Sequence, residues 1–144
     1  MRSIKKGLRV RDQASSYITK AKTSYKDLDI YKLSHELAIK IHEMTIMLPG
    51  FEMYEEASQI LRSSKAVPAN IVEGYGRRRY KKEFIRYMVF AHSSADETME
   101  HLRILFETKS LSKKYFDDLT ASDEILSKMI YRFIQAIQHG YKEI

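Results

Sequence analysis

A proline inside an apolar helical run constrains this chain more than any other feature. The run is Ala66-Val-Pro-Ala-Asn-Ile-Val-Glu-Gly74, and Tyr75-Gly76 follows it directly. Pro68 cannot donate a backbone hydrogen bond and clashes with the preceding turn, which costs about 3 kcal/mol in a helix interior. The two glycines favour the end of a helix. The segment therefore predicts a bent helix that stops near Tyr75.

Basic side chains gather directly after this stop. They are Arg77, Arg78, Arg79, Lys81, Lys82 and Arg86. Lysine and arginine neutralise the phosphates of nucleic acids without regard to base sequence. This cluster is therefore the strongest candidate for a nucleic-acid contact. A run of charge at a turn is equally often a solvated surface, and that interpretation stays open.

Hydrophobic periodicity predicts four helices. We expect the first from Ile30 to Leu48, the second from Glu52 to Tyr75, and the third from Lys81 to Lys109. The fourth begins after an N-cap at Ser112, carries apolar residues that include Ile125, and ends near Gly140. Asp29 is the expected N-cap of the first helix. Short connections force antiparallel neighbours, so the expected fold is all-α, an up-down-up-down four-helix bundle.

Composition narrows the function classes. Two prolines and five glycines in 144 residues are too few turn formers for an all-β fold. The absence of cysteine excludes disulfides and thiolate metal sites, and it fits a reducing compartment. No apolar run reaches the length of about 18 residues needed to span a membrane. We expect a cytoplasmic protein with no membrane association.

The net charge of +6 is concentrated at the N-terminus. Residues 1–26 hold eight basic side chains and one acid, whereas residues 27–144 hold 17 basic and 18 acidic side chains. We therefore divide the chain into a basic, flexible arm (1–26) and a helical domain (27–144). The arm suits electrostatic contact with RNA or DNA. A solubilising tail is an equal alternative, and an organellar transit peptide is a minor one.

The residues support no catalytic, cofactor or metal site. A di-iron bundle needs Glu-x-x-His pairs, and none of the five histidines is preceded by glutamate at that spacing. No Ser-His-Asp set can be assigned to an exposed turn. Only Glu73, Glu97 and His101 are candidates for acid–base chemistry, so an enzyme is the least favoured class.

Pro68, Asn70, Glu73 and Gly74 are expected to form a structural motif. The Asn70 amide, or the hydroxyls of Ser63 and Ser64, would satisfy backbone groups opened by the proline. Glu73 is expected to meet Arg62 or Arg86. We favour a polar cluster that fixes helix geometry, and a ligand site is the alternative.

Several motifs carry a family resemblance. Asp27-Leu28-x-Ile30-Tyr31 is similar to the pattern D-L-x-V-W, and AVPANIVEG (66–74) is similar to S-I-P-A-N-I-A-E-G. Glu83-Phe84 and Ala91-x-Ser93-Ser94-x-x-Glu97 match further positions. On these residues the chain, from about 27 to 137, resembles the four-helix bundle family named for proteins encoded in intervening sequences of bacterial 23S ribosomal RNA genes. Ala66 replaces the usual serine of the hallmark.

The resemblance implies a ring-shaped homopentamer without established enzymatic activity. The accessory protein of diversity-generating retroelements is related in fold and presents basic surface to nucleic acid. We therefore expect a non-enzymatic homo-oligomer, a pentamer by this analogy, that binds RNA or DNA through basic surface. A scaffold that recruits a protein partner is the alternative.

Overall fold

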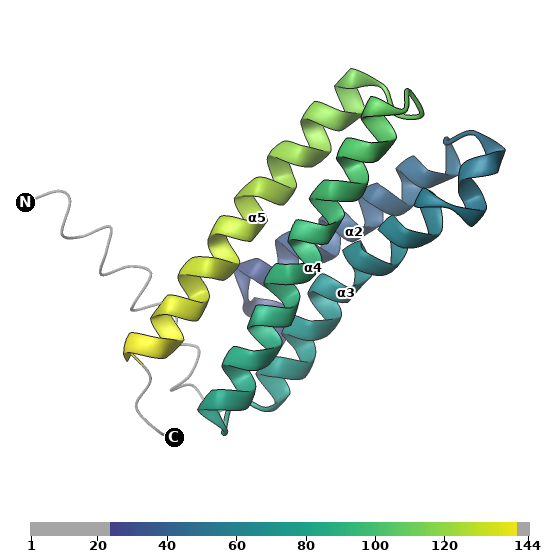
Figure 1. Cartoon of the computed structure of the whole chain (residues 1–144). Helices are drawn as coiled ribbons and strands as arrows, with labels where there is room; N and C mark the ends of the chain where they lie inside the picture. The colour runs from purple at the N-terminus through teal and green to yellow at the C-terminus, as the bar shows by residue number, and fades with distance from the viewer. Residues whose placement is uncertain (1–23, 141–144) are drawn as a thin grey trace, which may run out of the picture.

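The computed structural model describes residues 24–140 and consists of helices joined by short turns. Four long helices are present in that range (Figure 1): α2 (Asp29–Ile46), α3 (Glu56–Gly76), α4 (Lys81–Glu107) and α5 (Lys113–Gly140). Two 3-10 turns, η1 (Tyr25–Asp27) and η2 (Gly50–Tyr54), precede α2 and α3. No strand occurs among these residues, so the all-α prediction is confirmed.

Each helix packs mainly on its two neighbours, in the cyclic order α2, α3, α4, α5. The turns that join them are short, so successive helices run in opposite directions (Figure 1). This is the predicted up-down-up-down bundle. Most of the predicted arm (1–26) lies outside the described residues.

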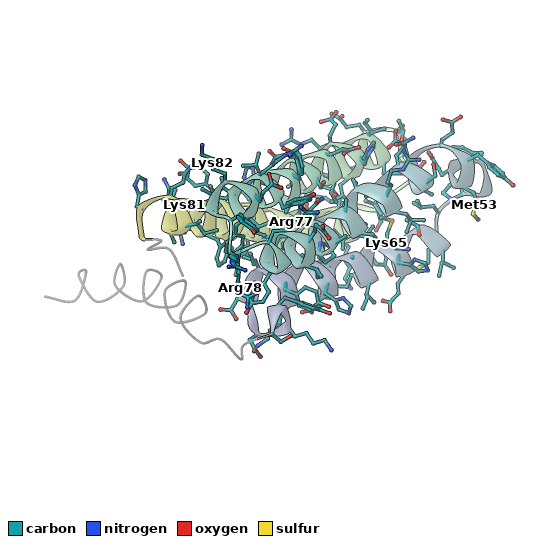
Figure 2. All side chains as sticks on the ribbon, turned by 90° about the horizontal axis from the view of Figure 1, so that it is seen from below. Met53, Lys65, Arg77, Arg78, Lys81 and Lys82 are labelled. Carbon is teal, nitrogen blue, oxygen red and sulfur yellow. The ribbon has the colours of Figure 1, made fainter. Side chains whose placement is uncertain are left out.

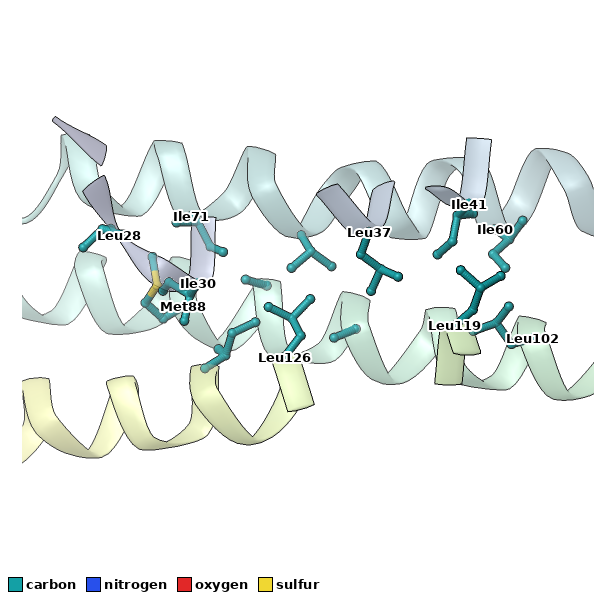
Figure 3. Close-up of a cluster of buried hydrophobic side chains, with 14 of the residues drawn as sticks. Leu28, Ile30, Leu37, Ile41, Ile60, Ile71, Met88, Leu102, Leu119 and Leu126 are labelled. Atoms are coloured by element: carbon teal, nitrogen blue, oxygen red, sulfur yellow. The ribbon is translucent and has the colours of Figure 1, made fainter. Parts of the chain in front are cut away.

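The core is a single apolar seam that runs the length of the bundle. Figure 3 shows part of it, with side chains from all four helices meeting between the ribbons. Residues that are at most 1% exposed include Ile41, Ile60, Ile71, Met88, Leu102 and Leu126. Full burial of one such side chain contributes roughly 1.5–3 kcal/mol, so this seam is the main source of stability.

Helix α3 continues through Pro68. The proline has no N–H for the carbonyl of Ser64, one turn earlier. Nearby side chains bond to the backbone: Asn70 Nδ2 donates to the Ala66 carbonyl at 2.8 Å, and the Ser63 hydroxyl donates to the Ile60 carbonyl at 3.3 Å. These side chains therefore bond to the helix backbone, but within residues 24–140 none of these contacts reaches the Ser64 carbonyl that the proline leaves open.

The start of the second helix was predicted incorrectly. Glu52 lies in the 3-10 turn η2, and α3 begins only at Glu56. Glu52 is 5% exposed because its carboxylate turns inward and accepts a hydrogen bond of 2.7 Å from the Ser110 hydroxyl. It thus joins the α2–α3 connection to the α4–α5 connection and does not sit in the first turn of a helix.

The other helix ends differ by one or two residues. Leu28, not Asp29, is the N-cap of α2. Helix α4 ends at Glu107 because Lys109 adopts a positive φ of 65°, a conformation that stops a helix. Ser112 caps α5 as predicted, since its hydroxyl accepts from the Tyr115 N–H at 3.4 Å.

Gly74 lies at a close approach of α3 and α4. A Cβ atom on Gly74 would be 2.7 Å from Met88 Cε and 2.9 Å from Tyr87 Cβ, both on α4. The helix does not stop at Gly74 but two residues later, at Gly76, which has open space around it. Gly74 is therefore a packing residue, and the shape of the α3–α4 pair depends on its missing side chain.

Polar contacts reinforce the same pair farther along. Thr98 Oγ1 lies 2.9 Å from Ser63 Oγ in the buried interface. Toward the start of α3, His101 Nδ1 lies 2.6 Å from Glu56 Oε2. Close packing at one end and directional contacts along the rest fix α4 against α3.

We expect Gly74→Ala to destabilise the protein. The added methyl group overpacks the interface, which costs about 1–3 kcal/mol and outweighs the gain in helix propensity of up to about 1 kcal/mol. Urea unfolding measures the change in free energy. Gly76→Ala is the matched control and should be neutral or slightly stabilising. Equal effects of the two substitutions would contradict the close-approach account.

Candidate nucleic-acid interface

The predicted basic cluster lies at the α3–α4 turn, at one end of the bundle. Figure 2 shows Arg78, Lys81 and Lys82 toward that end, with Met53 at the opposite end. The turn is tight because the Tyr80 N–H donates to the Arg77 carbonyl at 2.8 Å. The structure thus brings the predicted cations together, but their partners differ.

Arg77 is held by acidic and aromatic neighbours. Its Nε donates to Glu73 Oε1 at 3.0 Å, and its Nη2 lies 2.9 Å from the same oxygen. Its Nη1 lies 3.7 Å from Glu83, and the guanidinium covers the Tyr87 ring at 5.1 Å. The Glu73 hydrogen bond, followed by other contacts, raises the pKa of Arg77 above its ordinary value. Arg77 is engaged within the protein.

The predicted partners of Glu73 were wrong. Glu73 pairs with neither Arg62 nor Arg86, because Arg77 lies one turn away on the same helix. Side chains four residues apart on a helix are neighbours, so this pairing is the local choice. The exposed fraction of the Glu73 side chain is 51%, so it belongs to the surface and not to a buried cluster.

Three more cations of the cluster also have partners. Arg78 Nη1 donates to the Tyr75 carbonyl at 3.0 Å, and its guanidinium lies 4.1 Å from the centre of the Tyr75 ring. Lys81 Nζ donates to the Gln138 carbonyl of α5 at 3.1 Å. Arg86 Nη1 lies 3.6 Å from Glu83. These side chains hold the turn against the helices around it.

Arg79 and Lys82 differ from the other four. Both are exposed. Among residues 24–140, neither side chain takes part in a hydrogen bond, an ion pair or a ring contact. They lie three residues apart, on either side of Tyr80, where α4 begins. These two cations are available to an external anion without the loss of an internal contact.

The acid–base candidates lie in two separate places. His101 Nδ1 meets Glu56, and its Nε2 lies 3.5 Å from Glu97. Glu73 lies 17 residues from Glu56 along α3, about 25 Å at 1.5 Å per residue. In the described part of the chain, no three histidine or acidic side chains are grouped so as to hold a metal ion. Nor is any described helix both long and apolar enough to span a membrane.

Sequence reasoning missed Asp123 on α5. Asp123 is 1% exposed and its Oδ1 has no hydrogen-bond partner among residues 24–140. Burial, together with the charge of Asp96, raises the pKa of Asp123 to about 7. Its spacing gave a signal, because Asp123 falls four residues after Leu119 and three before Leu126, on the buried stripe. Ile125, which was expected in the core, is 56% exposed.

Comparisons with known proteins agree with this fold. Residues 26–132 match the family described as 23S rRNA-intervening sequence protein. A solved structure from Bacteroides thetaiotaomicron, a protein of unknown function from the S23 ribosomal protein family, is similar with a TM-score of 0.68 and 23% identity. The similarity covers 74% of this chain and 95% of that chain, and at this identity it shows the fold alone. No curated protein matches the chain.

The raised pKa of Asp123 predicts a pH dependence of stability. Between its ordinary pKa of 3.8 and about 7, the folded chain binds a proton that the unfolded chain does not. Asp123 therefore favours folding below about pH 4, and this contribution is lost as pH rises through 7. A difference of about 3 pH units corresponds to at most about 4 kcal/mol. We expect the free energy of unfolding to fall by about 1–4 kcal/mol as pH rises, because of the ionisation of Asp123.

Urea unfolding of the wild type and Asp123→Asn between pH 4.5 and 8 measures this contribution. The variant cannot ionise at this position, so its stability relative to the wild type should increase with pH. Asp117→Asn, an exposed position on the same helix, is the control and should follow the wild type. If the Asp123→Asn curve runs parallel to the wild-type curve, the pKa assignment is wrong.

Proposed function

This chain belongs to the 23S rRNA-intervening sequence protein family, and from that premise we propose that it is a non-enzymatic homo-oligomer that binds nucleic acid. The interface is the α3–α4 turn, and the contacts to phosphate come from Arg79 and Lys82. The proposed assembly is a ring of five copies in the cytoplasm. The single observation that carries the proposal is that these two exposed cations have no partner within residues 24–140.

The start of α4 supports phosphate binding at the same place. Its N-cap residue, Tyr80, makes no side-chain capping hydrogen bond, so the first N–H groups of α4 have no side-chain partner there. Helix N-termini favour phosphate because these N–H groups and the helix dipole point toward it. The one acid of the first turn, Glu83, is paired with Arg77 and Arg86. The negative charge of Glu83 therefore repels an incoming phosphate less than an unpaired carboxylate would.

Assembly would raise a weak local affinity. Two cations per copy form few phosphate contacts, and residues 27–144 carry nearly equal numbers of acids and bases. Linked copies convert later contacts into intramolecular ones, which increases avidity by a factor of roughly 10²–10⁴ when geometry permits. We propose that the basic residues of the arm add to this contact.

A second candidate function, a protein-binding scaffold, is favoured by the opposite end of the bundle. Phe51, Met53 and Tyr54 of η2 are 69%, 61% and 88% exposed, and Ile46 and Met47 at the end of α2 are 72% and 68% exposed. A group of large exposed apolar side chains marks an association surface. Under this alternative, a protein partner would co-purify after nuclease treatment and no RNA or DNA would bind.

The double substitution Arg79→Gln/Lys82→Gln tests the proposed function. Each phosphate contact contributes about 0.9 to the slope of log affinity against log salt for duplex DNA. Loss of two contacts should therefore lower the slope by about 2 per engaged copy and weaken binding at every sequence. Fluorescence anisotropy with labelled RNA and DNA over a salt series provides the measurement. Light scattering on nuclease-treated protein first establishes the number of copies.

Lys113→Gln/Lys114→Gln is the matched control for this experiment. Both lysines are exposed at the start of α5, at the other end of the bundle, and the charge change is identical. The control should retain wild-type affinity. Equal losses in the two variants would show that net charge matters and the turn does not. Failure of the wild type to bind any nucleic acid at low salt would overturn the proposal.

A further inference from the structure

A depression of about 320 Å³ lies between α4 and α5, away from the basic turn. Its lining includes Asp96, Met99 and Arg103 from α4, and Phe116, Asp123 and Ser127 from α5. Asp123, one of these lining residues, carries the only side-chain oxygen of residues 24–140 that is buried without a hydrogen-bond partner, Oδ1. Because buried polar groups are nearly always satisfied, such an oxygen indicates a partner that residues 24–140 do not supply.

A second carboxylate is held beside Asp123. Asp96 Oδ1 accepts a hydrogen bond of 3.3 Å from the Ser127 hydroxyl, and Asp96 Oδ2 lies 3.7 Å from His92 Nδ1. Ser127 Oγ also lies 3.1 Å from His92 Nε2. The charge of Asp96 helps to raise the pKa of Asp123. Together the two acids create a local negative potential that favours a cation.

The other charged side chains near the depression do not neutralise Asp123. Arg103 on α4 and Glu124 on α5 also line the depression. Glu124 Oε1 pairs with Lys128 Nζ at 3.6 Å, and Arg103 makes no ion pair within residues 24–140. From α2, which also packs on α5, Lys40 and Glu43 line a separate cavity with Asp118. No described cation therefore neutralises Asp123.

We propose that this depression binds an organic cation, an alkylammonium or guanidinium group, with Asp123 and Asp96 as its anionic partners. A metal ion fits less well, because the described residues offer no group of three metal-binding side chains here. Met99 and Phe116 supply apolar walls that suit an alkyl stem or a planar guanidinium. Phe116 is held by stacking on Phe106 at 4.4 Å, whereas the flexible Met99 side chain can yield to a ligand.

A catalytic role for Ser127, His92 and Asp96 is the main alternative, and the geometry opposes it. Ser127 lies in the middle of α5, where backbone N–H groups are used by the helix. They cannot stabilise the oxyanion that forms during acyl transfer. The negative charge of Asp123 in the same depression would further destabilise that oxyanion. Ser127 and His92 instead hold the Asp96 carboxylate in place.

The cation can come from two sources that share one chemistry. A free polyamine can enter from solvent, or a lysine or arginine side chain of a second copy can insert. Either source makes Asp123 ionise, so binding releases a proton. The proposal is independent of nucleic-acid binding at the basic turn.

The test follows the Asp123 side-chain carboxyl by ¹³C NMR in the full-length protein, with putrescine and guanidinium ion as probes. We expect either probe to lower the pKa of Asp123 and to bind about tenfold more tightly at pH 8 than at pH 6, because the ionised fraction rises by that factor around a pKa near 7. Asp123→Asn should lose this binding, and Asp117→Asn should retain it.

The outcomes separate the two sources. Probe binding to the wild type that Asp123→Asn abolishes identifies a free organic cation as the ligand. If no probe binds but Asp123→Asn alone changes the number of copies seen by light scattering, the cation is a side chain of a second copy. The proposal is overturned if the Asp123 pKa is unmoved by the probes and all variants keep wild-type assembly. Equal probe binding to the wild type and Asp123→Asn also overturns it.

Discussion

The close approach of α3 and α4 at Gly74 is the contact on which the rest of the structure depends. Only a residue without Cβ lets the backbone of α3 lie over Tyr87 and Met88. This approach permits the short turn from Gly76 to Lys81. The position of that turn sets where its cations lie. The position of the basic surface is therefore a consequence of helix packing, because the packing of α3 on α4 sets where the turn and its arginines lie.

Charge is distributed along the bundle so that its parts differ in what they can bind. One end carries two cations that have no partner within residues 24–140, and the opposite end carries exposed apolar side chains. The depression between α4 and α5 holds two carboxylates. Because the helical domain is nearly neutral, any attraction for a polyanion is local. The internal partners of Arg77, Arg78 and Lys81 stabilise the turn, so only part of the cluster is left for the proposed contact with phosphate.

Helical periodicity was enough to predict the four helices, because apolar side chains at 3–4 residue spacing must share one seam. Errors arose where one side chain makes a long-range contact, as Glu52 does with Ser110, since sequence spacing does not reveal such partners. The Glu73–Arg77 pair was accessible from its i,i+4 spacing. Asp123 was accessible as a polar residue on an apolar stripe. The sequence could not show which cations of the basic cluster have internal partners, because that depends on tertiary neighbours.

Native-state amide hydrogen exchange tests most directly whether the Gly74 contact makes the α3–α4 corner rigid. Helix ends normally fray and exchange through local opening. The account predicts that amides of Ile71, Gly74 and Met88 exchange only through global unfolding, with the same free energy as the bundle centre at Ile60 and Leu102. Exchange of these corner amides by local opening, with free energies several kcal/mol lower, would contradict it.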